Sequence, residues 1–195
     1  MTRWTLFGAL SVLVAVITAI SYGVAPDPVQ SLQSAVRVTA RTSFLLFLAA
    51  FVASSMMELA PSTLSRALMR ERRYLGLSFA FSHFLHAVAL IAYVRIAPEA
   101  FWVGRTPATN IPGSIGYVLI LLLVITSFKG AARLIGPDGW KRLHSIGVWV
   151  IAVIFAASWL SRIPHHAAYA VPGIVMIGAM VLRGVARYRR RVGEA

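Results

Sequence analysis

The chain has 195 residues, of which 58% are hydrophobic and 13% are charged, whereas soluble domains are about 45–50% apolar and about 25% charged. This composition excludes an ordinary soluble protein and leaves too little polar chain for a second, soluble domain. The formal net charge is +13, but the basic residues lie in short connections between apolar runs, so membrane orientation explains them better than nucleic-acid binding. Cysteine is absent, which excludes disulfides, zinc–thiolate sites and cysteine-ligated iron–sulfur clusters.

Apolar segments long enough to cross a bilayer recur along the chain, each needing about 20 residues. We expect six transmembrane helices, at roughly 4–24, 42–59, 74–96, 112–128, 143–161 and 168–186. The first could instead be a secretory signal with a small-residue cleavage site at Gly23-Val24-Ala25, although its length favours a retained helix. The predicted fold is therefore all-α, an integral membrane bundle of six helices that forms a single domain over residues 1–195.

The basic residues are distributed unequally between the two sides of these segments. Of the 19 Lys and Arg residues, 14 lie at the N-terminus, in the connections 60–73 and 129–142, and in the C-terminal tail together with the last turn of the sixth segment. Because cytoplasmic connections carry the excess of Lys and Arg, both termini are expected in the cytoplasm.

Histidines are the residues most capable of chemistry in this chain, because a polar side chain inside a span is costly and suggests function. His83 and His86 stand at i and i+3 of the third segment, so they share one helix face; interhelical hydrogen bonding and metal ligation both remain open. His144 lies at the start of the fifth segment, and His165 and His166 follow Pro164 in a short connection.

Other chemistries find little support in the sequence. There is no Ser-His-Asp arrangement, phosphate-binding glycine loop or dinucleotide fingerprint, and no pair of carboxylates lies within a span. A proton-relay transporter or a membrane hydrolase is therefore not favoured.

Three stretches resemble a known family. They are Arg41 to Phe47, the Arg72-Arg73-Tyr74-Leu75-Gly76-Leu77 run with His86 thirteen residues after Arg73, and Thr126-Ser127 through Trp140 to His144. Over about residues 41–160 the chain resembles the ferric reductase-like transmembrane domain family. Within that family it is most similar to the haem-binding membrane subunits of bacterial methionine sulfoxide reductase systems.

This resemblance implies one or two b-type haems in an electron-transfer subunit of the bacterial inner (cytoplasmic) membrane, a component of an oxidoreductase. It places haem iron ligands at His86 and His144, and His83 is an alternative to His86. Arg73 and Arg142 could pair with haem propionates. Electrons would come from a quinol or a reductase partner, with a quinone or a partner's flavin as possible further cofactors. For the sulfoxide reductase group the acceptor would be a periplasmic molybdopterin enzyme.

One position departs from the family pattern. The family has a second histidine about thirteen residues after the one at His144, and here that position is Ala157. His86 could therefore ligate haem alone, pair with His165 or His166, or belong to a site that has been lost, which would leave a haem-free scaffold protein. His86 lies about 20 Å into its helix and His144 about 3 Å into a helix that runs the same way, so one iron can hardly take both. His144 could instead pair with Met56 or Met57.

Overall fold

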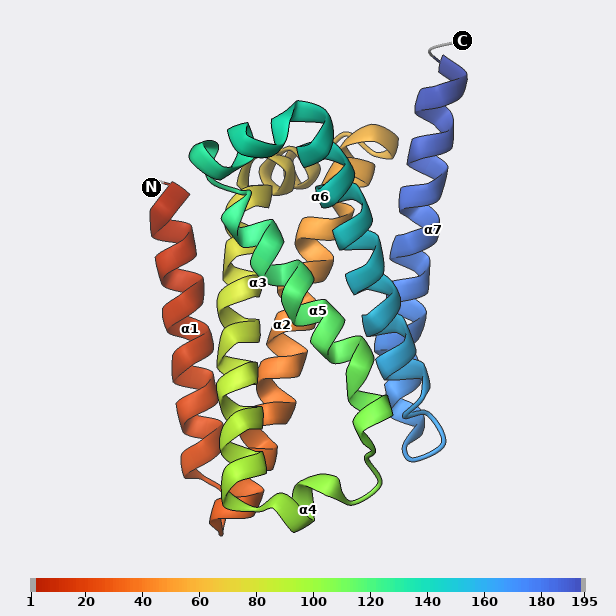
Figure 1. Cartoon of the computed structure of the whole chain (residues 1–195). Coiled ribbons are helices and arrows are strands. Elements are labelled where there is room, and N and C mark those ends of the chain that lie inside the picture. Colours follow the sequence, from red (N-terminus) through yellow and green to blue (C-terminus); the bar gives the residue numbers. More distant parts are fainter. Residues whose placement is uncertain (1–2, 194–195) are drawn as a thin grey trace. The chain divides into compact units, whose positions relative to one another are not determined.

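The computed structural model describes residues 3–193, which form helices joined by short turns and irregular connections (Figure 1). Six of the helices are long and apolar enough to cross a membrane, which confirms the predicted fold class and number of spans. In chain order the elements are α1 (Arg3–Gly23), α2 (Pro28–Leu59), α3 (Thr63–Ile96), the short α4 (Pro98–Trp102), α5 (Pro107–Ile125), α6 (Lys129–Leu160), the 3₁₀ turn η1 (Ala167–Tyr169) and α7 (Ala170–Gly193).

Three helices begin well before their apolar segments, so the predicted starts at 42, 74 and 143 were wrong. α2 begins at Pro28, where the Asp27 carboxylate accepts a hydrogen bond from the Gln30 amide at 2.9 Å. α3 begins at Thr63, behind Ser62, whose hydroxyl accepts from the Ser65 amide at 3.1 Å. These side chains accept hydrogen bonds from first-turn amides that have no partner within the helix. Capping of this kind lets α2 and α3 begin in polar sequence, before their apolar segments.

The chain folds as two compact units. The first comprises the chain up to Phe47 together with Arg73–Ile111, and the second comprises Leu48–Arg72 together with the chain from Pro112 onward. Each unit draws on segments distant in sequence, because α2 and α3 each contribute to both.

In the first unit, α3 packs between α1 and α2. The ring of Trp4 lies 5.3 Å from that of Tyr74, and Phe7 lies 6.5 Å from Phe81, so α1 and α3 run parallel. Contacts between α2 and α3 run in the opposite order, from Phe47 with Phe79 to Gln33 with Tyr93. This antiparallel register determines which side chains of α2 face the histidines of α3.

In the second unit, α6 packs against α5 and α7. A bend interrupts α6 at Gly136, whose φ of 68° and ψ of 170° are not helical, and Pro137 restarts the helix. α6 and α7 run side by side beyond the bend (Figure 1). Gly173 permits the close approach, since a Cβ there would lie 2.9 Å from Leu160 Cδ2.

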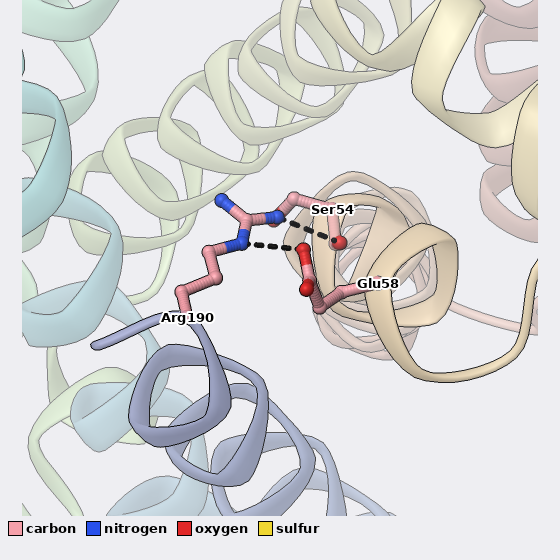
Figure 2. Close-up of polar contacts among 3 residues, drawn as sticks. All are labelled: Ser54, Glu58 and Arg190. Atoms are coloured by element: carbon pink, nitrogen blue, oxygen red, sulfur yellow. Dashed lines mark hydrogen bonds and ion pairs between the residues drawn. The ribbon is translucent and has the colours of Figure 1, made fainter. Parts of the chain in front are cut away.

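Two arginines of α7 contact the C-terminal half of α2 within this second unit. Arg183 donates to the Phe51 carbonyl at 2.6 Å, with its guanidinium 4.7 Å from the centre of the Phe51 ring. Nearer the end of α2, Arg190 bonds the Ser54 carbonyl, one turn beyond Phe51, at 3.5 Å and the Glu58 carboxylate, two turns beyond it, at 2.6 Å (Figure 2). α2 and α7 are therefore joined by polar contacts as well as by packing.

Candidate functional site

The His86 imidazole lies on α3 against a row of buried hydroxyl groups. Nδ1 of His86 lies 2.9 Å from Oγ1 of Thr39 on α2. Thr39 is fully buried, and its hydroxyl also lies 2.6 Å from the Ala35 carbonyl oxygen, to which it donates. His86 itself is half-buried.

The Thr39 contact favours one tautomer of the His86 imidazole. A hydroxyl has one proton to donate, and when Thr39 donates it to the Ala35 carbonyl, the Thr39 oxygen accepts from Nδ1 of His86. In a neutral imidazole with this bond, Nδ1 carries the proton and Nε2 has the lone pair. Neutral imidazole with the second nitrogen bonded to an oxygen is the usual form of a metal-ligating histidine.

Further hydroxyl groups extend the row beyond Thr39. Ser82 of α3 accepts from Ser43 at 2.9 Å, and its oxygen lies 2.9 Å from that of Thr42. Ser43 and Ser82 are fully buried. Sequence reasoning missed these residues, although Ser78, Ser82 and His86 recur every four residues on one face of α3.

His83 lies one turn before His86 on the same helix. The two imidazole ring centres are 5.2 Å apart, and the Phe79 ring lies 5.5 Å from that of His83. Arg73 is exposed, with its guanidinium 5.9 Å from the centre of the Tyr74 ring. It precedes His86 by thirteen residues, about 20 Å of helix, so Arg73 and His86 do not touch.

His144 belongs to the second unit, where a hydrogen bond and a ring contact hold it. Its Nε2 lies 3.0 Å from Oγ1 of Thr126, which donates to the Leu122 carbonyl at 2.7 Å. When the Thr126 hydroxyl donates to Leu122, its oxygen accepts from Nε2 of His144, and in a neutral imidazole Nδ1 then has the lone pair.

The Trp140 ring stacks on His144, with centres 4.3 Å apart, and its indole donates to the Thr126 carbonyl at 2.9 Å. Arg142, two residues before His144, is exposed. Met57, whose sulfur lies 3.9 Å from the Ser65 hydroxyl, contacts a serine of α3.

His165 and His166 lie at the opposite end of α6 from His144. His165 is exposed, and His166 accepts from the Ala168 amide at 3.2 Å, so it caps η1. Sixteen residues of α6, about 24 Å, separate His144 from Leu160, so His144 and His165 cannot share one iron. Ala157 is exposed.

The described residues suit an axially ligated cofactor better than a free metal ion. Within residues 3–193, no group of three or more His, Cys, Asp or Glu side chains is placed to hold a metal ion. Haem needs only axial ligands from the protein, and the half-buried His86, with its Nε2 lone pair, has the chemistry of one.

Comparison with known proteins places the chain in a family. Residues 39–155 match the family described as ferric reductase like transmembrane component. The chain is also 30% identical over 122 residues to the protein-methionine-sulfoxide reductase heme-binding subunit MsrQ of Caulobacter vibrioides; the match covers 60% of this chain and 56% of that relative, so it spans little more than half of the relative's length. No solved structure matches significantly. These matches confirm the resemblance expected from the sequence, and the chain belongs to the ferric reductase-like transmembrane family.

Proposed function

We propose that this chain is a haem b-binding membrane subunit that passes electrons from a quinol or a reductase partner to an acceptor. Membership of the ferric reductase-like family supports a membrane electron-transfer role, and the relative from Caulobacter vibrioides is described as a haem-binding subunit. The observation that carries the proposal is the Thr39–His86 contact of 2.9 Å, by which α2 orients a half-buried imidazole of α3.

Bound haem would supply one-electron transfer, and the residues of this chain would hold and tune it. His86 is the proposed axial ligand, oriented by Thr39, and His83 is the alternative one turn away. His144, with its lone pair on Nδ1, is the proposed ligand of a second haem in the other unit. Arg73 and Arg142, both exposed cations, are proposed to pair with haem propionates.

The setting of the proposed function is the inner membrane, with both termini in the cytoplasm. The location of 14 of the 19 basic residues on one predicted side supports this orientation. The donor would be a quinol or a flavin-bearing reductase partner, and the acceptor another protein, such as a periplasmic molybdopterin enzyme that reduces methionine sulfoxide.

The first test is a reduced-minus-oxidised absorption spectrum of the detergent-purified protein, with haem counted per chain. We expect a b-type band and one or two haems per chain, and we expect His86→Ala to remove the haem that His86 ligates because an axial bond is lost. Parallel His83→Ala, His144→Ala and His165→Ala variants show which other histidines contribute.

Phe84→Ala is the matched control, because Phe84 lies between the two α3 histidines and its side chain is 62% exposed. It should keep its haem. If His86→Ala retains full haem content, His86 is not the ligand. If the wild-type protein, expressed with ample haem, shows no band, the chain is instead a haem-free scaffold or interaction protein that has kept the family fold.

A further inference from the structure

An open pocket that the haem proposal does not use lies at the bend of α6. Its volume is about 430 Å³, and its lining residues are Lys129, Ala132, Arg133, Gly136, Pro137 and Trp140. The bend exists because Gly136 adopts a positive φ of 68°, which side-chain-bearing residues rarely adopt. All six lining residues belong to the second unit.

The pocket combines two cations with one fixed aromatic wall. Lys129 and Arg133 stand at i and i+4 of the short helical stretch before the bend, so both side chains lie on one face. The Trp140 indole is held in place by the Thr126 carbonyl and by stacking on His144. Asp138 is the acidic residue nearest in sequence, and it is not among the lining residues.

The same stretch exposes large apolar side chains. Leu134 is 87% exposed, Phe128 is 43% exposed and Ile135 is 40% exposed. They lie beside a span end, where Trp and basic residues favour the headgroup level of a bilayer. A ligand complementary to this surface has an anionic head for Lys129 and Arg133 and apolar chains for Leu134 and its neighbours.

We propose that the α6 pocket, lined by Lys129, Arg133 and Trp140, binds the phosphate headgroup of an anionic phospholipid whose acyl chains cover Leu134. The two cations pair with the phosphate oxygens through charge-assisted hydrogen bonds. Basic residues at a membrane surface select anionic lipids over zwitterionic ones, which carry no net charge.

Native mass spectrometry of the detergent-purified protein tests this proposal, with phosphatidylglycerol and phosphatidylcholine of equal acyl length as probes. We expect at least one phosphatidylglycerol to bind more than tenfold more tightly than phosphatidylcholine. The double variant Lys129→Gln/Arg133→Gln should bind phosphatidylglycerol about tenfold to thirtyfold more weakly, because each basic residue at an anionic surface contributes measurably.

Arg189→Gln/Arg191→Gln is the matched control, since it removes the same charge from exposed positions near the end of α7. It should bind phosphatidylglycerol as the wild type does. Leu134→Gln should weaken phosphatidylglycerol binding while leaving both cations in place, because it removes apolar contact with the acyl chains.

Three outcomes would overturn the proposal. The first is equal binding of the two lipids, and the second is an equal loss of phosphatidylglycerol binding in the Arg189/Arg191 control. The third is displacement of phosphatidylglycerol by millimolar inorganic phosphate with no effect of Leu134→Gln, which would identify a site for a soluble anion. Circular dichroism and the elution volume confirm that each variant remains folded.

Discussion

The hydroxyl of Thr39 orients the His86 imidazole through a contact of 2.9 Å with Nδ1. Thr39 lies on α2, and its hydroxyl donates a hydrogen bond to the Ala35 carbonyl. In this arrangement the imidazole donates from Nδ1, and an Nδ1–H bonded to an oxygen increases the electron density that Nε2 can offer to a metal. Thr39 is thus proposed to tune the site while His86 binds the iron.

The variant Thr39→Val tests this tuning, because valine keeps the side-chain shape and removes the acceptor oxygen. We expect the haem to remain bound, since His86 is unchanged, but its reduction potential to rise, because a less basic imidazole stabilises ferric iron less. A spectroelectrochemical titration measures the shift.

Thr42→Val is the matched control for that titration. Thr42 also lies on α2, but its hydroxyl faces Ser82 at 2.9 Å. The haem reduction potential of Thr42→Val should stay close to that of the wild type. Equal shifts in the two variants would show that loss of any hydroxyl of the row has this effect, and would refute a specific role for Thr39.

At the scale of helices, hydropathy predicts which segments cross the membrane but does not predict where each helix begins. The six spans were evident because each contains an uninterrupted apolar run. The polar extensions of α2, α3 and α6 were missed, since an apolar window detects burial in lipid and is insensitive to capping by residues such as Asp27 and Ser62. The α6 pocket lies in one of these missed extensions.

The contacts between α2 and α7 allow a prediction about the stability of the second unit. The Arg190 and Glu58 side chains are 51% and 32% exposed, so solvent screens their attraction. A double-mutant cycle with Arg190→Gln and Glu58→Gln should give a coupling free energy below about 1 kcal/mol, measured from unfolding in mixed detergent micelles.

Arg183→Met should reduce the free energy of unfolding more than Arg190→Gln does. Arg183 is half-buried and combines its bond to the Phe51 carbonyl with stacking on the Phe51 ring, and both contacts are less accessible to water. Exposed Arg189 provides the control through Arg189→Gln, which should leave the unfolding free energy unchanged. A coupling well above 1 kcal/mol, or a smaller effect of Arg183→Met, would contradict this ranking.

At the scale of the whole chain, the candidate site shows what a sequence can and cannot reveal. The histidine spacing on α3 is local and was visible as His83 and His86. The partner Thr39 is 47 residues away, and it meets His86 only through the antiparallel register of α2 and α3, which no local pattern encodes. Charge distribution, by contrast, is a property of the chain as a whole and can be read directly from the sequence.

That charge distribution leads to a topology prediction that suits this chain well, because it has no native cysteine. Single cysteines can be placed at exposed positions, with Val24→Cys and Val103→Cys on the predicted outer side and Leu64→Cys and Val192→Cys on the cytoplasmic side. A membrane-impermeant maleimide added to intact bacterial spheroplasts should label the first pair, and it should label the second pair only after permeabilisation. The opposite pattern would mean that the basic connections face outward, and the proposed electron donor and acceptor would then have to exchange sides of the membrane.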